Sequence, residues 1–149
     1  MAQVLFTRLK ANWPTATLTV LAPAWSLALL ERMPEVDATL VLPFVHGEAA
    51  LRERWRLGAT LRAHGFDWAI ILPNSWKSAL ILTASGIARR TGWVGEFRCG
   101  LLNDIRKLDK QQLPLMIQRF AALAEPAITL NDLELIQARL SQDCLPRPK

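Results

Sequence analysis

The sequence predicts an α/β domain in which helices flank a mostly parallel β-sheet. Segments with the spacing of an amphipathic helix alternate along the chain with short runs rich in β-branched and other apolar residues. The run at 67–72 is continuously apolar after its aspartate, as is typical of a strand buried on both faces. Because helical and strand segments alternate, successive strands are expected to run parallel through crossover helices.

The first part of the chain contains two predicted pairs of helix and strand. Residues 3–11 form a helix with apolar residues on one side, and residues 18–21 form a short strand. A helix at 24–32 and a strand at 38–42 follow. Prolines interrupt helices and central strands, and these segments are bounded by Pro14, Pro34 and Pro43.

The middle of the chain carries the clearest signals. A helix at 48–63 has an apolar stripe and several arginines, and Gly65 follows its end. The strand at 67–72 leads through a Pro-Asn-Ser turn into a helix at 76–85, which Gly86 closes. The stripe of the first helix consists of Leu51, Trp55 and Leu61.

The last third is predicted to contain a strand at 90–94, a long polar loop at 95–110 and a helix at 113–124. The tail after Pro126 is expected to hold one short helix and then a linker ending in Pro-Arg-Pro-Lys. We therefore divide the chain into a domain at 1–125 and a linker or tail at 126–149.

Composition excludes several classes of protein. A chain of 149 residues with 51% hydrophobic and 21% charged residues can bury a core, so disorder is excluded. Its apolar runs are too short to span a bilayer, and its start lacks the pattern of a signal peptide, which favours the cytoplasm. Cys99 and Cys144 are interpreted as reduced thiols, because neither belongs to a CxxC pair.

The net charge of +5 suits an anionic partner, such as nucleic acid, phospholipid headgroups or a phosphorylated sugar. A plain effect on solubility explains the charge equally well. No glycine-rich turn joins a strand to a helix, so the sequence carries neither a dinucleotide fingerprint nor a phosphate-binding P-loop. No metal-ligand spacing is present, and the sequence predicts no cofactor.

A candidate ligand site lies at residues 73–78, where a predicted strand passes into a helix. In parallel sheets ligands bind beyond the carboxyl ends of the strands, and a helix start attracts anions. The positive charge of Lys77 lies in the first turn, where the partial positive charge of the helix N-terminus disfavours it. A bound phosphate or carboxylate would offset this cost; otherwise Lys77 is a solvated lysine. Asn74 and Ser75 either contact this ligand or simply cap the helix.

A second candidate cluster begins at Arg89, and its Arg90 is expected to return to the same edge of the sheet as Lys77. Arginines suit phosphate groups and an indole suits a sugar face, but the charged residues could equally pair with one another on a loop. Asp104 could act as a general base, but a single carboxylate without a partner is weak evidence for that role. His46 is interpreted as a surface residue. The cluster comprises Arg89, Arg90, Thr91, Gly92, Trp93, Glu96, Arg98, Asn103, Asp104 and Arg106.

At these segments the chain resembles the ADP-heptose:lipopolysaccharide heptosyltransferases, glycosyltransferase family 9. The most specific stretches read LPNSWKSAL at 72–80 and RTGWVGE at 90–96. The likeness covers residues 1–124 almost continuously. Further matching stretches lie at 21–25, 32–36, 100–104 and 113–116.

The resemblance implies the acceptor-binding, N-terminal lobe of a GT-B glycosyltransferase, a Rossmann-like parallel sheet flanked by helices. Such enzymes transfer heptose from ADP-heptose to the inner core of lipopolysaccharide at the cytoplasmic face of the inner membrane, without a tightly held metal. The implied partners are this phosphorylated glycolipid and the membrane surface, and ADP-heptose would bind through a C-terminal lobe. The implied acceptor-binding residues are Asn74, Ser75, Lys77, Ser78, Arg90, Thr91 and Arg98.

The chain departs from the family pattern at both ends. Family members begin with a strand and a glycine-containing turn that carries the proposed catalytic aspartate, whereas this chain begins in the following helix. It therefore carries no candidate catalytic residue, and the absent strand would lie near the middle of the sheet. We expect an inactive fragment that is poorly stable or self-associates.

Two other classes of function remain open. A non-catalytic domain could use the same cleft to bind an anionic ligand. A nucleic-acid binder is disfavoured, because the tryptophans stand at helix-packing positions rather than on an exposed stacking platform.

Overall fold

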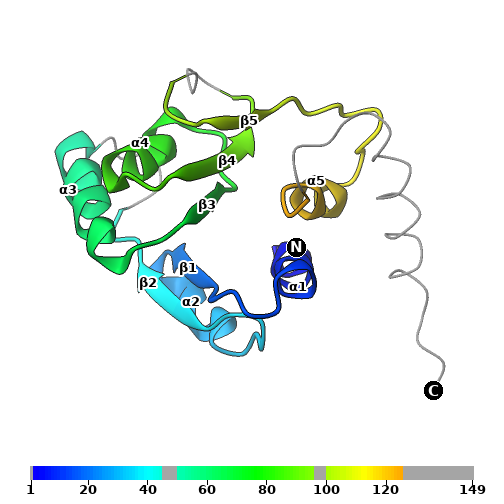
Figure 1. The fold of residues 1–149 in the computed structure, drawn as a ribbon, viewed down its shortest axis with the longest axis horizontal. Coiled ribbons are helices and arrows are strands. Elements are labelled where there is room, and N and C mark those ends of the chain that lie inside the picture. The colour runs from blue at the N-terminus through cyan, green and yellow to red at the C-terminus, as the bar shows by residue number, and fades with distance from the viewer. Residues whose placement is uncertain (1, 45–49, 96–99, 126–149) are drawn as a thin grey trace.

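The computed structural model describes residues 2–44, 50–95 and 100–125. Within them, helices and strands alternate as the sequence predicts as far as β4, at Arg89–Trp93 (Figure 1). In chain order the elements are α1 (Gln3–Asn12), β1 (Thr19–Ala22), α2 (Ala24–Leu30), β2 (Ala38–Val41), α3 (Leu51–Leu61), the 3-10 helix η1 (Arg62–His64), β3 (Trp68–Ile71), α4 (Trp76–Ser85), β4 (Arg89–Trp93), β5 (Asp104–Arg106) and α5 (Met116–Ala122).

The strands form two parallel sheets rather than one. β1 pairs with β2, and β4 lies between β3 and β5 in the second sheet. In Figure 1 the smaller sheet lies below the larger one. The division falls between β1 and β3 (Figure 1).

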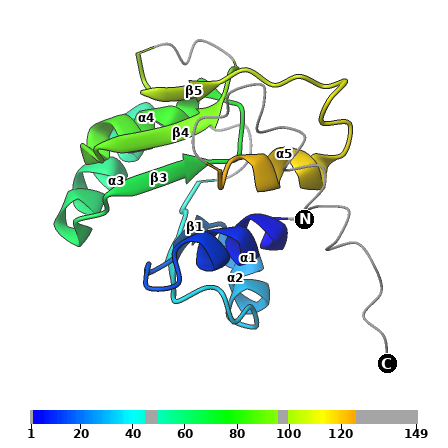
Figure 2. The ribbon, with the colours of Figure 1, turned by 45° about the vertical axis from the view of Figure 1, so that its right-hand side comes forward.

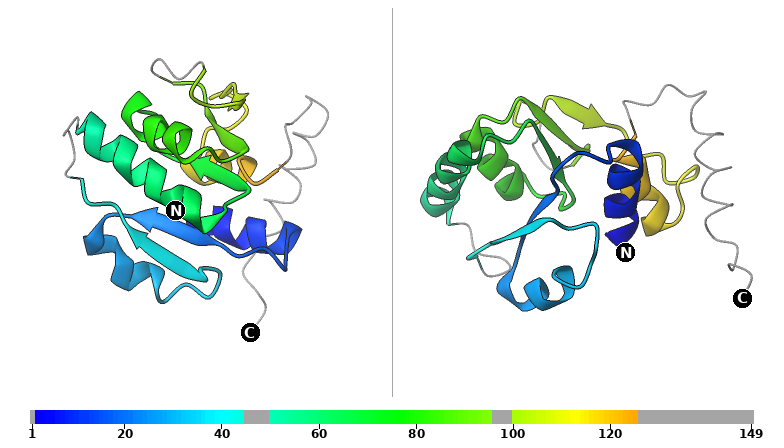
Figure 3. Two further views of the ribbon diagram at one scale, coloured as in Figure 1. Left: turned by 60° about the vertical axis from the view of Figure 1, so that its left-hand side comes forward. Right: turned by 60° about the horizontal axis from the view of Figure 1, so that its bottom comes forward.

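Helices cover the larger sheet and bury its apolar side chains. α3 and α4 run alongside each other on one side, and α1 lies beside α5 on the other (Figures 2 and 3). Ile71 of β3, Ala79 of α4 and Leu102 form a small core on the α4 side. The main core gathers the buried side chains of Leu5, Phe6, Leu30, Trp93, Leu113, Ala122, Leu123 and Ala124.

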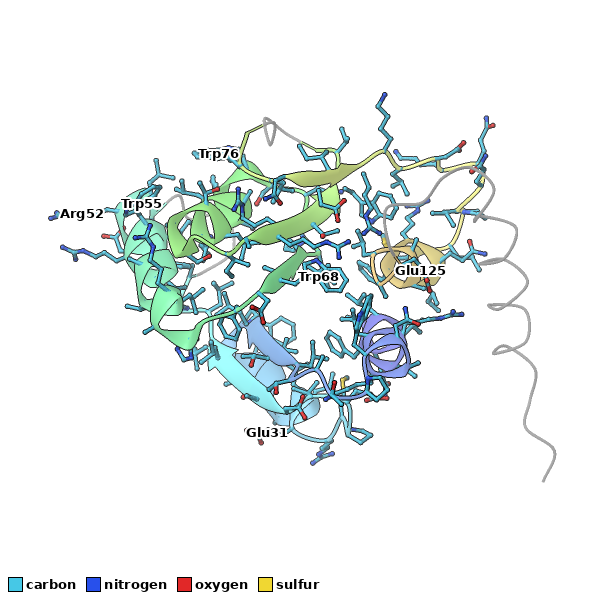
Figure 4. The ribbon with its side chains drawn as sticks, viewed as in Figure 1. Glu31, Arg52, Trp55, Trp68, Trp76 and Glu125 are labelled. Atoms are coloured by element: carbon cyan, nitrogen blue, oxygen red, sulfur yellow. The ribbon has the colours of Figure 1, made fainter. Side chains whose placement is uncertain are left out.

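Two polar contacts in its second half join α1 to other parts of the chain. Arg8 pairs with Glu125 at 3.7 Å, which ties α1 to the segment after α5; Glu125 is labelled in Figure 4. Lys10 donates to the carboxylate of Asp37 at 2.6 Å, and this carboxylate also accepts the Leu18 N–H at 2.6 Å. The Leu18 and Lys10 hydrogen bonds lower the pKa of Asp37 despite partial desolvation. Asp37 therefore joins α1 to the start of both strands of the smaller sheet.

Glycines determine how α3 and α4 end and how closely they pack. Gly65 and Gly86 adopt left-handed conformations, with φ of 63° and 70°, and end η1 and α4 as predicted. Gly58 lies against α4, where a Cβ atom would overlap the carbonyl oxygen of Ile81 and come within 2.5 Å of the Ala84 Cβ. This glycine allows the two helices to approach closely.

Several predicted boundaries are wrong. The loop expected at 95–110 contains strand β5, which pairs with β4 through Thr91 opposite Asp104. The polar character of this segment suggested a loop. In the structure Asp104 and Arg106 form an ion pair within the sheet, so their charges are compatible with a strand. The helices expected at 24–32 and 113–124 are shorter, at 24–30 and 116–122: turns follow at 31–32 and 123–124, and α5 begins only after residues 113–115.

Among the described residues, none of the helices combines the length and apolar character needed to cross a membrane. The linker or tail expected at 126–149, with its short helix, lies outside the described residues.

Candidate functional site

The candidate site lies where β3 leads into α4. β3 ends at Ile71, and α4 begins at Trp76 after a short turn, at the carboxyl end of the strand. Ser75 holds the N-cap position with an extended backbone, ψ 143°, yet its side chain makes no capping hydrogen bond to the first turn. Its hydroxyl instead pairs with that of Ser78 at 3.0 Å. The side-chain cap considered for Ser75 is therefore not observed.

Lys77 gives this helix start a positive charge. It is half-buried in the first turn of α4, a turn that contains no acidic residue. The ten-residue helix adds the partial positive charge of its N-terminus. Asn74, Ser75, Lys77 and Ser78 thus come together at one helix start, in an arrangement whose chemistry suits a phosphate or carboxylate.

Arg90 does not share this edge of the sheet, so the position expected for it is wrong. It is the second residue of β4 and pairs in register with Ala69, near the amino end of the parallel strands. Its guanidinium donates to the carbonyl oxygens of Ile87 at 2.6 Å and Leu101 at 3.0 Å. Arg90 therefore ties together the two segments that flank its strand.

Thr91 is fully buried, with 0% of its surface exposed, which does not fit the direct ligand contact expected for it. Its hydroxyl accepts the indole N–H of Trp68 at 2.7 Å and donates to Asp104 at 2.8 Å. Trp93 is 6% exposed and belongs to the main core, so its indole does not present a face to a sugar.

Asp104 is the centre of an ion network across β4 and β5. Its Oδ2 atom accepts from Arg89 at 3.1 Å and from Arg106 at 3.2 Å, besides Thr91. Burial by itself raises the pKa of this carboxyl, but the hydrogen bonds from Arg106 and Thr91, the charge of Arg106 and the bond from Arg89 outweigh it, so the pKa is lowered. A carboxylate held ionised in this way is a weak base. The expected pairing is found for Asp104 and Arg106, but in strand β5 with Arg106 buried rather than on a loop surface.

Trp68 links this network to the end of α1. Arg89 lies over the Trp68 ring at 4.2 Å from its centroid, and Trp13 meets the ring edge-on at 5.1 Å between centroids. Figure 4 labels Trp68 beside β3. This role of Trp68 was not predicted from the sequence; the signal was the run Arg-Arg-Thr-Gly-Trp, in which a strand of the domain core carries polar side chains.

Other candidate features lie elsewhere or outside the described residues. A shallow cavity of about 400 Å³ lies between the ends of α3 and α4, at the opposite edge of the sheet from Lys77. Among the residues that the structure describes, no three His, Cys, Asp or Glu side chains gather as a metal site would require. His46, Glu96, Arg98, Cys99 and Cys144 fall outside the described part of the chain.

The comparisons with known proteins all match this chain to relatives of one family. The model of glycosyltransferase family 9 (heptosyltransferase) matches residues 54–145. Lipopolysaccharide heptosyltransferase 2 of Escherichia coli K12 is 51% identical over 124 residues, and lipooligosaccharide heptosyltransferase 2 of Haemophilus ducreyi is 46% identical over the same length. These alignments cover 83% of this chain and 36% and 35% of the relatives, so the chain spans about a third of their length.

The fold is similar to that of a solved member of the family. The structure of the E. coli ADP-heptose lipopolysaccharide heptosyltransferase II superposes with a TM-score of 0.80 at 44% identity. The match covers 99% of this chain and 40% of the solved one. It confirms the expected parallel strands flanked by helices. The family match extends over more than half of the chain, and this protein belongs to glycosyltransferase family 9, the heptosyltransferases.

Proposed function

We propose that this chain is the acceptor-binding lobe of a transferase that moves heptose from ADP-heptose to the inner core of lipopolysaccharide. The observation that carries the proposal is the continuous identity of 46–52% to four lipopolysaccharide or lipooligosaccharide heptosyltransferases over 124 residues. The chain corresponds to about a third of their length, so we propose that it is inactive alone. ADP-heptose would bind to the part of the relatives that the chain does not match.

The proposed acceptor contacts lie at the start of α4. A phosphate of the acceptor would interact with the ammonium of Lys77 and with the first-turn N–H groups, while Asn74, Ser75 and Ser78 would offer hydrogen bonds. This combination suits a phosphorylated sugar better than a neutral one. Arg98 remains a proposed contact, whereas we assign Arg90 and Thr91 to holding β4 in place.

The proposal is tested by binding of a delipidated, phosphorylated heptose-I core oligosaccharide, measured by isothermal titration calorimetry. Lys77→Ala removes a charge-assisted contact worth about 1.5–3 kcal/mol, which lowers affinity by about ten- to hundredfold. Lys110→Ala is the matched control, because Lys110 is exposed in the turn that leads to α5. Equal affinity for Lys77→Ala and wild type would refute the assignment.

Activity gives a second test. The purified chain is expected to transfer no heptose from ADP-heptose above a blank without protein, whereas turnover would contradict its proposed role as one lobe.

The alternative, a non-catalytic domain for an anionic ligand, uses the same helix start. It predicts that Lys77→Ala lowers affinity for simple phosphorylated sugars as much as for the core oligosaccharide. Binding to a random oligonucleotide that exceeds both, across a series of salt concentrations, would instead favour the nucleic-acid class.

We further propose that the protein works in the cytoplasm, peripherally at the inner membrane, because its proposed acceptor is a membrane-borne glycolipid. The net charge of +5 supports attraction to such a surface.

A further inference from the structure

We propose that one side of α3, together with the start of α4, is the surface that docks onto an anionic phospholipid membrane. The surface, here called the α3 membrane face, consists of Leu51, Arg52, Trp55, Arg56 and Trp76. The inference deepens the proposed function, on which it rests, by naming the part of the lobe that meets the membrane.

The apolar residues of this face are not the ones that α3 buries. The buried residues of the helix are Arg54, Gly58 and Leu61. Leu51 and Trp55 lie one turn apart and remain 44% and 50% exposed. An apolar pair outside the core contact is therefore left to solvent on this helix.

The arginines lie on the same side as this pair. At 100° per residue, Leu51, Trp55, Arg52 and Arg56 fall in that rotational order within one sector of about 140°. All four are exposed, and Glu53 lies outside the sector. A helix side that combines tryptophan, leucine and arginine is typical of proteins that bind at a membrane interface.

The start of α4 extends this face. α3 and α4 run in the same direction, because Arg62 after α3 donates to the carbonyl of Ala84 near the end of α4, and Gly58 packs against Ile81. Counting back along both helices, Trp76 lies at the level of the first turn of α3. Figure 4 shows Arg52, Trp55 and Trp76 on the same side of the molecule.

Charge and position favour a lipid surface over other occupants. The two arginines can pair with the phosphates of lipid headgroups, while the apolar pair beside them can contact the hydrocarbon beneath. Because Lys77 follows Trp76 directly, docking on this face would bring the proposed acceptor site to the membrane that holds the glycolipid. A second copy of this chain would meet the same arginines with its own, which opposes pairing of two such faces.

The test is co-sedimentation of the chain with phosphatidylcholine vesicles, with and without phosphatidylglycerol. Wild type is expected to bind the anionic vesicles and to bind much less to phosphatidylcholine alone. Each arginine near an anionic surface changes binding about fivefold, so Arg52→Gln/Arg56→Gln should weaken it by about 25-fold. Trp55→Ala should also weaken binding, because the indole prefers the interface.

Matched controls separate this face from general charge and hydrophobicity. Trp25 on α2 is 85% exposed and lies on a helix without arginine, so Trp25→Ala should leave binding unchanged. Arg32→Gln removes an exposed arginine elsewhere. Circular dichroism of each variant verifies the fold. Because Arg52 and Arg56 are exposed, the arginine variant tests the proposal even if Trp55→Ala unfolds.

The proposal is overturned if the arginine pair binds anionic vesicles as wild type does, or if the control variants lose as much binding as the face variants. Failure of the proposed function would look different. The vesicles contain no lipopolysaccharide, and the calorimetry contains no phospholipid. Loss of oligosaccharide binding in Lys77→Ala therefore tests the proposed function, and loss of vesicle binding in the face variants tests the membrane face. The two results are independent.

Discussion

Replacing Asp104 with alanine removes the acceptor that three side chains share at the junction of β4 and β5. The carboxylate accepts from Thr91, Arg89 and Arg106, and Arg106 also donates to the carbonyl of Ala122 at 2.7 Å. The Arg106 side chain is 7% exposed, so it cannot recover a full hydration shell when its partner is lost. Arg89 is 40% exposed and contributes little.

The expected loss of folding stability follows from the burial of Arg106, which the substitution leaves without its ionic partner. Removing one member of a buried ion pair costs about 3–5 kcal/mol, a large share of the 5–15 kcal/mol that a domain typically has. Asp104→Asn should cost less than Asp104→Ala, because the amide oxygen still accepts a hydrogen bond. In the double variant Asp104→Ala/Arg106→Met the loss should be smaller than the sum of the single losses, since no buried charge is left unpaired.

The assay is urea unfolding followed by tryptophan fluorescence, because Trp68 bonds to Thr91 and reports on the network. With a urea m-value of about 1.5–2 kcal/mol per molar, a loss of 3 kcal/mol lowers the midpoint by about 1.5–2 M. Asp67→Ala, an exposed aspartate just before β3, is the control and should stay within about 0.5 kcal/mol of wild type. A loss below about 1 kcal/mol in Asp104→Ala would refute the reasoning that the pair is buried and coupled.

Three further outcomes are expected. The pKa of Asp104 is lowered from its ordinary 3.8, so its carboxylate stabilises the fold above pH 3.8. That contribution is lost as the pH falls towards the lowered pKa. In acid titrations the difference in stability between wild type and Asp104→Asn should therefore shrink below pH 4. Gly58→Ala should destabilise more than Gly92→Ala in the same urea assay, because its Cβ meets the backbone carbonyl of Ile81 on α4, whereas the atoms nearest to the Cβ of Gly92 are side-chain atoms of Ile71 and Leu102; the reverse order would contradict the packing. The chain should associate as concentration rises in analytical ultracentrifugation, because β1 and β3 each have one edge that no strand pairs with among the described residues; a monodisperse monomer would count against it.

Much of the fold could be predicted because local signals agreed with tertiary structure. The helix at 76–85 has both of its predicted ends, since a turn and Gly86 mark them. β5 could not be predicted, because its charges are compatible with a strand only once Thr91 and the arginines surround Asp104. Long-range neutralisation of this kind leaves no local trace in the sequence.

The candidate site was predictable at Lys77 but not at Arg90. The rule that ligands bind at the carboxyl ends of parallel strands locates Lys77 directly. For Arg90 the deciding fact is that β4 begins three residues after Gly86, so position 90 still lies near the amino end of its strand. The buried state of Thr91 and Trp93 depends on how β4 is flanked by β3 and β5, which periodicity alone does not reveal.

The separation of the two sheets has a consequence for how the molecule opens. Each ladder of backbone hydrogen bonds is confined to its own sheet, so β1 and β2 are joined to the larger sheet through side-chain packing, while Asp37 ties them to Lys10 of α1. Packing of this kind loosens at lower free energy than a strand paired on both sides, and β4 is paired on both sides. Amide hydrogens of the smaller sheet should therefore exchange with solvent through sub-global openings that leave β3, β4 and α4 intact. The helix start that carries Lys77 belongs to the unit that opens last.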